Sequence, residues 1–236
     1  MIEKPDKGFG RTVDRYLRKE DTLLAKGIKG ICSLQGADYR NSVFKRGFEL
    51  AITLPMATLS IPITAMLGVA ARREDGGTAF YIQERVGKGG KPVDIVKVRS
   101  MKMTAPAELS PYVGNPEDDP RHTSVGRKIR ALELDELPQL LQVLKGDISL
   151  IDVRIIPQYN IDYIKANRPK SFEAWRKAYE AGKPGGMNLD PALNSRPNHA
   201  LTRLHYDMLY AKKASLGLDL YIIFKTTGRL LKKLGK

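Results

Sequence analysis

The sequence predicts an α+β fold that is mostly helical, with one long apolar segment, one small β-hairpin and amphipathic helices at the surface. The apolar segment is Leu50–Ala71, a run of 22 residues without a charged side chain. Two short runs rich in β-forming residues, Ala79–Gln83 and Val93–Val98, flank a glycine-rich turn and indicate the hairpin. Apolar residues at a spacing of three and four indicate the helices, most clearly in residues 126–144 and 216–234.

The composition narrows the class of partner. The 236 residues carry a formal net charge of +14, which favours nucleic acid, an anionic membrane surface or a phosphorylated substrate. Cys32 is the single cysteine, which excludes an intramolecular disulfide and a cysteine-rich zinc site. The three histidines lack the spacing of metal ligands. The N-terminal stretch MIEKPDKGFGR lacks the apolar region of a signal peptide, so we expect the bulk of the chain to stay in the cytoplasm.

The uncharged run is long enough to cross a bilayer, which takes about 20 apolar residues. Pro55 and Pro62 interrupt it, and each removes a helical hydrogen bond. Basic pairs at residues 45–46 and 72–73 flank the run, and basic residues favour the cytoplasmic side of a membrane, so both ends favour the same side. The residues alone leave three alternatives open: a helix broken near Ser60 that enters one leaflet and returns, a single span, and a buried core helix.

The second strand of the predicted hairpin carries Lys97 and Arg99, which are two residues apart and therefore on one face of the strand. Two cations on one face suit a phosphate-rich ligand, and we expect both to bind phosphate. A solvated strand face would carry the same pattern, so the residues alone leave both interpretations open.

Two adjacent carboxylates, Asp135 and Glu136, lie in the segment 126–154, and Pro138 follows them at once. Proline is tolerated in the first turn of a helix and disrupts its interior. We therefore expect a helix to begin near Asp135, with both acids in its first turn, where the helix dipole favours them. An acidic first turn is one interpretation of this pair, and a reactive pair of carboxylates is the other.

The last helix, Leu216–Leu234, has an apolar face and a basic face, typical of a helix in a membrane interface or of a packed terminal helix. Residues 1–44 are interpreted as a basic N-terminal appendage with a short helix over Thr12–Ala25. The remaining predicted elements are a loop over residues 104–122, a helix over 158–181, a loop over 182–200 and a helix over Leu201–Ala214.

Four stretches match one family in order, from Lys45 to about Leu231. They are KRGFEL with the apolar run after it, QERVGKGGKPVDIVKVRSM, IRALELDELPQLLQVLKGDISL and LHYDMLYAKKASLGLDLYIIFKT. The chain thereby resembles the bacterial sugar transferases, and among them the small monotopic phosphoglycosyl transferases. The resemblance implies a re-entrant membrane hairpin over residues 45–73 and a cytoplasmic catalytic domain over residues 74–236. The proline of the family's membrane Ser-Pro break matches Pro62, with Ser60 two residues earlier.

The resemblance also implies an activity. Members of this family move a sugar phosphate from a nucleoside diphosphate sugar, usually a UDP-sugar, to polyprenyl phosphate. Asp135 would attack the β-phosphate and carry the phosphosugar covalently, and Glu136 would help to hold Mg²⁺. The transfer would initiate assembly of a surface glycan (exopolysaccharide, capsule, O-antigen or glycoprotein) at the cytoplasmic face of the inner membrane.

Further positions match the family residue by residue. Lys97 and Arg130 match basic positions near the carboxylate pair, and Arg154 matches the arginine of a Gly-Pro-Arg-Pro motif. The resemblance implies that all three bind phosphate oxygens. Asp207 matches a family aspartate ahead of the last helix.

The chain departs from the family in two places. The Gly-Pro-Arg-Pro motif reads Asp152-Val153-Arg154-Ile155, which adds a carboxylate beside the expected phosphate site. The Pro-Gly-Ile-Thr-Gly loop reads Pro184-Gly185-Gly186-Met187-Asn188. These departures favour the alternative function, a non-catalytic membrane-surface homologue that binds nucleotide sugars or partner enzymes, whereas the intact carboxylate pair favours the enzyme. A nucleic-acid binder would also explain the charge, but the sequence shows no helix-turn-helix or RNA-binding signature, so we expect no nucleic-acid partner.

Overall fold

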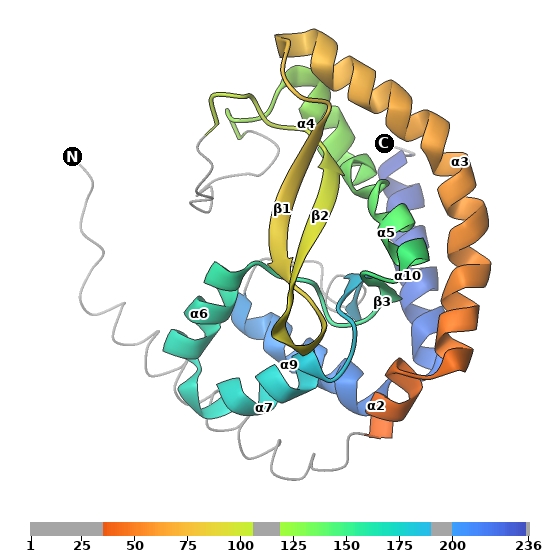
Figure 1. Ribbon diagram of the computed structural model, residues 1–236, viewed down its shortest axis with the longest axis vertical. Helices are drawn as coiled ribbons and strands as arrows, with labels where there is room; N and C mark the ends of the chain where they lie inside the picture. The colour runs from red at the N-terminus through yellow and green to blue at the C-terminus, as the bar shows by residue number, and fades with distance from the viewer. Residues whose placement is uncertain (1–34, 106–118, 190–199, 235–236) are drawn as a thin grey trace.

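The computed structural model describes residues 35–105, 119–189 and 200–234, so the helix predicted over Thr12–Ala25 lies outside the described residues. The described chain is mostly helical, with two small two-stranded sheets (Figure 1). Its helices, in chain order, are α2 (Gln35–Arg40), α3 (Val43–Asp75), α4 (Ser124–Ala131), α5 (Gln139–Lys145), α6 (Gln158–Asn167), α7 (Pro169–Glu180), α9 (Ala200–Lys213) and α10 (Leu216–Leu234).

The predicted hairpin is confirmed as β1 (Phe80–Val86) and β2 (Pro92–Val98), which pair antiparallel. A 3₁₀ turn, η1 (Lys88–Gly90), joins them, and its two glycines adopt positive φ angles of 64° and 77°. A second, parallel pair joins β3 (Ser149–Ile151) to β4 (Gly185–Met187). β4 lies in the segment predicted as a loop, because a strand of three residues is too short to show alternation.

The helix α3 has its polar residues inside and its apolar residues outside. Its buried positions are all charged, polar or small: Lys45, Glu49, Thr53, Ala57, Ser60, Gly68 and Ala71. Its exposed positions include large apolar side chains: Leu54, Met56, Leu59, Ile61, Ile63, Met66 and Val69. A core helix of a soluble protein has the opposite distribution, so the core-helix alternative is excluded. α3 is the one helix in the described part of the chain that is long and apolar enough to cross a membrane.

The helix α3 runs without a break through Pro55 and Pro62. Figure 1 shows it arched along one side of the molecule and not folded back on itself. The Ser60 hydroxyl donates to the Ala57 carbonyl oxygen at 2.9 Å, within the part of the helix that the prolines disturb. The structure therefore has a continuous arched helix where the sequence predicted a break, and the re-entrant course through a membrane stays a prediction.

Helices α6, α7 and α9 pack together at the end of the molecule where the β1–β2 turn lies (Figure 1). The fully buried Trp175 of α7 lies between the rings of Phe172 and Tyr179, with centroid distances of 6.2 and 5.1 Å. The single helix predicted over residues 158–181 is two helices, because Pro169 disfavours the helical conformation at Arg168. The two predicted C-terminal helices are confirmed as α9 and α10.

Two apolar clusters hold these elements together. The larger cluster surrounds β3 and includes Ile148, Ile151, Trp175 and Ile222. The smaller joins the end of α3 to β2 and α4 through Ala71, Val98 and Ile129.

Candidate active site

The two adjacent carboxylates lie in a sharp turn between α4 and α5. Glu133 takes a left-handed conformation with φ 59° and ψ 21°, which stops α4. A 3₁₀ turn, η3 (Leu134–Glu136), then presents Asp135 and Glu136, and Pro138 caps the start of α5. The helix that was predicted to begin near Asp135 therefore begins only after Pro138, because the left-handed residue has already reversed the chain.

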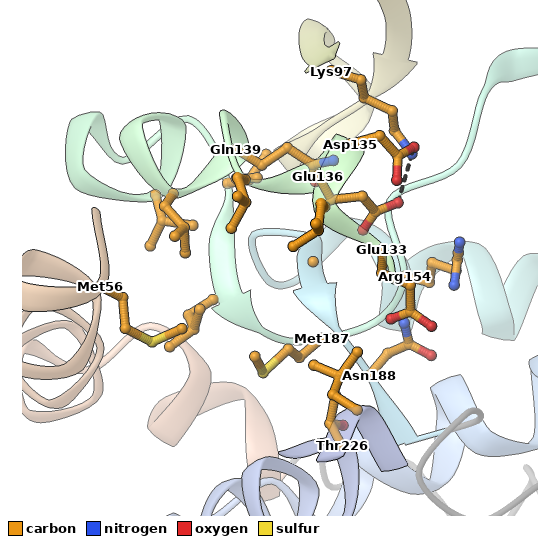
Figure 2. Close-up of a pocket in the computed structure, with 18 of the residues that line it drawn as sticks. Met56, Lys97, Glu133, Asp135, Glu136, Gln139, Arg154, Met187, Asn188 and Thr226 are labelled. Atoms are coloured by element: carbon orange, nitrogen blue, oxygen red, sulfur yellow. Dashed lines mark hydrogen bonds and ion pairs between the residues drawn. The ribbon is translucent and has the colours of Figure 1, made fainter. Parts of the chain in front are cut away.

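The pair opens onto a cavity of about 460 Å³, a size typical of small-molecule sites (Figure 2). Five cationic side chains among the described residues line this cavity: Arg85, Lys97, Arg130, Arg154 and Arg229. In Figure 2, Lys97 and the carboxylate pair lie at the top of the cavity, Asn188 and Thr226 lie at the bottom, and Met56 of α3 lies at the left. Helices α3 and α10 thus contribute to the same cavity as the hairpin and the carboxylate turn.

Lys97 forms ion pairs with both carboxylates. Its Nζ lies 2.5 Å from Oε1 of Glu136 and 4.0 Å from Oδ2 of Asp135. Burial raises the pKa of Glu136, but Lys97, Arg154 and Arg85 outweigh it and lower the pKa to about 2. Burial raises the pKa of Asp135, with Glu136 adding to the rise and Lys97 opposing it. Glu136 is therefore ionised at neutral pH, and Asp135 is a buried carboxyl that gains from any further positive charge.

The arginines on the opposite wall differ in their attachment. Arg85 donates from Nη1 to the Ile155 carbonyl oxygen at 2.7 Å and from Nη2 to Oε1 of Gln83 at 2.9 Å. Arg154 makes no side-chain hydrogen bond with another described residue, while its backbone is bridged to Gly185 beside β4. The Arg154 guanidinium is consequently available for an anionic ligand, on a fixed backbone.

The added carboxylate, Asp152, does not face the cavity. Its side chain is fully buried and accepts two bonds from Arg40, from Nη2 at 2.5 Å and from Nε at 3.1 Å. Arg40 therefore neutralises Asp152 behind the site, and the change from the family motif adds no negative charge to the cavity.

Comparison with known proteins decides the family. Residues 40–233 match the family described as bacterial sugar transferase. The chain belongs to the bacterial sugar transferase family.

Its relatives in this family include enzymes named for polyprenyl-linked sugar transfer. The chain is 33% identical over 217 residues to undecaprenyl-phosphate galactose phosphotransferase of Salmonella typhimurium, covering 83% of this chain and 42% of the relative. It is 33% identical over 193 residues to UDP-glucose:undecaprenyl-phosphate glucose-1-phosphate transferase of Caulobacter vibrioides, covering 79% of this chain and 69% of the relative. Several other curated relatives are matched over less than half of their length.

Two residues that were predicted from the sequence as part of this transferase site lie elsewhere. Arg99 is 5% exposed and donates to Oδ1 of Asp75 at 2.5 Å, to Oδ2 at 2.7 Å and to the Ala71 carbonyl oxygen at 2.8 Å. It clamps the end of α3 instead of facing the cavity, because β2 ends at Val98 and the strand alternation does not extend to it. Asp207 is buried and accepts from Nε1 of Trp175 at 3.0 Å, which ties α9 to α7.

Sequence reasoning missed several residues on the cavity wall. Arg85 lies in the family-like stretch QERVGK, and Asn188 lies in the altered loop, so both carried a signal. Glu133 adjoins the carboxylate pair, and Arg229 and Lys233 of α10 hold its carboxylate at 3.3 and 2.8 Å. Met56 and Thr226 carried no signal, because only tertiary packing brings α3 and α10 to the site.

The donor set fits Mg²⁺, the ion that the family implies. Among the described residues no cluster of three or more His, Cys, Asp or Glu side chains could hold a metal by itself. Mg²⁺ needs no such cage, since it keeps several waters and is bound through one or two carboxylates and the substrate's phosphates. Glu136, beside Asp135 in the same turn, would supply such a carboxylate.

Proposed function

We propose that this chain transfers a phosphosugar from a UDP-sugar to polyprenyl phosphate. The observation that carries the proposal is the carboxylate pair, set among five cationic side chains in a cavity that an outward-apolar helix also lines. A diphosphate brings negative charge to two carboxylates, and the cations offset this repulsion. The named relatives, whose substrates are sugar donors and undecaprenyl phosphate, support the proposal.

In the first step, a carboxylate oxygen of Asp135 attacks the β-phosphorus of the donor. The bond from that phosphorus to the bridging oxygen breaks, and the nucleoside monophosphate leaves with the oxygen and its electron pair. Asp135 then carries the phosphosugar as an acyl phosphate. Lys97 and Arg154 bind oxygens of the transferring phosphate, where negative charge develops. Bound Mg²⁺, held through Glu136, would supply further charge neutralisation at the diphosphate.

In the second step, a phosphate oxygen of polyprenyl phosphate attacks the same phosphorus. The bond to Asp135 breaks, the carboxylate is restored, and the product is a polyprenyl diphosphosugar. Arg130, which is exposed at the cavity wall, is suited to bind the incoming phosphate.

We further propose that residues 45–73 enter one leaflet and return, which leaves the catalytic domain of residues 74–236 on the cytoplasmic face of the inner membrane. The large apolar side chains of α3 support insertion, since exposed apolar patches of this kind mark protein or membrane interaction sites. Met56 connects the two regions, because it is exposed on α3 and lines the cavity. The product would initiate assembly of a surface glycan.

The alternative of a non-catalytic homologue loses one of its two supports, since Arg40 neutralises Asp152 away from the cavity. The altered loop that ends at Asn188 is the other support.

Release of nucleoside monophosphate tests the proposed function. Detergent-solubilised protein is incubated with UDP-glucose, UDP-galactose or their N-acetylhexosamine counterparts, together with Mg²⁺ and undecaprenyl phosphate. We expect UMP release from at least one donor, abolished by Asp135→Asn or by EDTA and unchanged in Asp162→Asn, an exposed aspartate of α6. No release from any donor by folded, vesicle-bound protein would refute the enzyme and favour the non-catalytic homologue.

A further inference from the structure

A neutral polar side chain lies buried and unpaired in the cavity. Asn188 is 2% exposed and lines the cavity wall. Neither its Nδ2 nor its Oδ1 has a hydrogen-bond partner within the described chain. Native proteins pair nearly all buried polar side-chain atoms, so an amide with both ends unpaired needs an explanation.

The amide of Asn188 does not hold the surrounding loop in place. Backbone bonds do this, since β4 pairs with β3 and the Asp152 amide donates to the Met187 carbonyl oxygen at 3.1 Å. The Asn188 side chain therefore contributes polar atoms to the cavity and is not needed to hold the loop.

The position of Asn188 indicates which part of a ligand it meets. Figure 2 shows Asn188 and Thr226 at the end of the cavity away from Lys97, and α10, which carries Thr226, contacts β4. The Thr226 side chain adds a second neutral polar group at this end. Glu133 and Arg229 also line the cavity and pair with each other at 3.3 Å, whereas the Asn188 amide and the Thr226 hydroxyl are uncharged and suit hydroxyl groups of a ligand.

The order of groups along the donor indicates that Asn188 meets the sugar and not the base. In a nucleoside diphosphate sugar, the sugar is bonded directly to the phosphate that Asp135 would attack. The base is separated from this phosphate by a second phosphate and a ribose. The transferred sugar and the ribose both offer hydroxyls beyond the phosphates, and the sugar is the one bonded to the reacting phosphate.

We propose that Asn188, with Thr226 at the same end of the cavity, binds hydroxyl groups of the transferred sugar and sets which sugar is accepted. This inference rests on the proposed function. A carboxamide offers an NH₂ donor and an oxygen acceptor, which complement two adjacent hydroxyls that each donate and accept. A site built this way discriminates between epimers, because the wrong epimer leaves its buried polar groups unpaired.

Binding measurements separate the sugar from the nucleotide. The dissociation constants of UDP and of four UDP-hexoses are measured by calorimetry in detergent with Mg²⁺, for wild type, Asn188→Leu, Asn188→Gly and Thr226→Val. Leucine keeps the volume and removes both polar atoms, and glycine removes the whole side chain, so a folding defect in one variant is recognised by the other. Asn160→Leu, on α6 and outside the cavity lining, is the matched control.

We expect both Asn188 variants to weaken binding of the preferred UDP-hexose about 10–100-fold, with UDP binding unchanged within about twofold. The preference between glucose and galactose epimers should fall toward one, and Asn160→Leu should change nothing. Unchanged hexose binding would overturn the proposal, as would an equal loss for UDP and UDP-hexose, which would assign the amide to the nucleotide or the fold. Wild type that binds no UDP-hexose would refute both proposals, whereas selective binding without UMP release would refute the transferase alone.

Discussion

Replacing Arg40 by methionine should destabilise the protein strongly, although Arg40 does not line the cavity. The Arg40 and Asp152 side chains are both fully buried, and the guanidinium makes two bonds to the carboxylate and one to the Ala178 carbonyl oxygen at 2.7 Å. Methionine keeps an unbranched apolar chain but leaves the buried charge of Asp152 without its ion-pair partner, with only the Val153 amide still donating to Oδ1 at 2.6 Å. Breaking a buried pair in this way costs about 3–5 kcal/mol, which corresponds to a fall in Tm of about 6–20 °C for a chain of this size.

A double-mutant cycle tests the origin of this loss. Asp152→Asn removes the charge that Arg40→Met leaves unpaired, so the double variant should be more stable than the sum of the single effects by about 1.5–3 kcal/mol. Thermal unfolding of the detergent-solubilised protein followed by tryptophan fluorescence gives the four values, and the single Trp175 lies buried in the core. Additive effects would refute the reasoning, because they would mean that Arg40 acts through packing and not through the buried charge of Asp152.

Three further predictions concern the site, acid stability and the membrane. Lys97→Gln should lower kcat/KM for phosphosugar transfer about 10²–10³-fold. Arg99→Gln should instead lower Tm and leave kcat/KM within about twofold. The reverse pattern would contradict the positions of these two residues. The hydrogen bond from Arg121 lowers the pKa of Asp119 from 3.8 to about 2, so its stabilising effect is present above about pH 4 and is lost as the pH falls toward 2. The Tm difference between wild type and Asp119→Asn should therefore shrink over this range, and a constant difference would rule out the assignment. Leu59 lies on α3 and is 71% exposed, and Leu59→Asp should reduce flotation of the protein with anionic vesicles, since a central Asp costs about 2.5–3.5 kcal/mol in the bilayer. The control is Tyr163→Asp, at a position on α6 that is 50% exposed. An equal loss of flotation for this control would contradict insertion by α3.

The sequence predicted the cavity residues that lie in the part of the chain covered by the family resemblance. Asp135 and Glu136 lie on the cavity because a single turn presents them, and Lys97, Arg130 and Arg154 join them there. These residues belong to stretches that the family resemblance covers, so their positions could be assigned one by one.

Residues that reach the cavity through distant pairing could not be predicted. The last residue of β1, Val86, bridges to Ile156, and this contact places Arg85 beside the segment that carries Arg154. No local pattern shows a bridge between positions so far apart in the chain. Arg99 was predicted at the cavity and does not lie there, because the alternation of β2 holds only as far as Val98.

The apolar run of α3 was visible in the sequence, but its direction was not. Two faces of this helix differ in size and polarity more than in hydropathy, because alanine and glycine share the inner face with Thr53 and Ser60. Only the packed structure shows that the small and polar residues face inward and the large apolar ones face outward.

The inner face of α3 also explains how an outward-apolar helix is held on the domain. Lys45 Nζ donates to Oδ2 of Asp219 in α10 at 2.7 Å, to the Tyr210 hydroxyl of α9 at 3.0 Å and to the Ile151 carbonyl oxygen of β3 at 2.8 Å. Glu49, one turn later, accepts from the Ile151 amide at 3.2 Å. Both charges are buried, so this attachment includes paired polar groups in addition to the apolar contacts that α3 makes with the two clusters.

This attachment links the apolar surface to the reaction cavity. β3 leads directly into the segment that carries Arg154, and α10 supplies Thr226, so the elements that Lys45 joins also form two walls of the cavity. In the proposed reaction, the lipid-borne acceptor would present its phosphate at a fixed depth, set by the headgroups, whereas the second substrate would arrive from water. An enzyme that joins these two must keep its carboxylate pair at that depth. Buried, directional bonds fix such a distance better than apolar packing, which tolerates sliding, and this accounts for charged residues on the inner face of the most apolar helix.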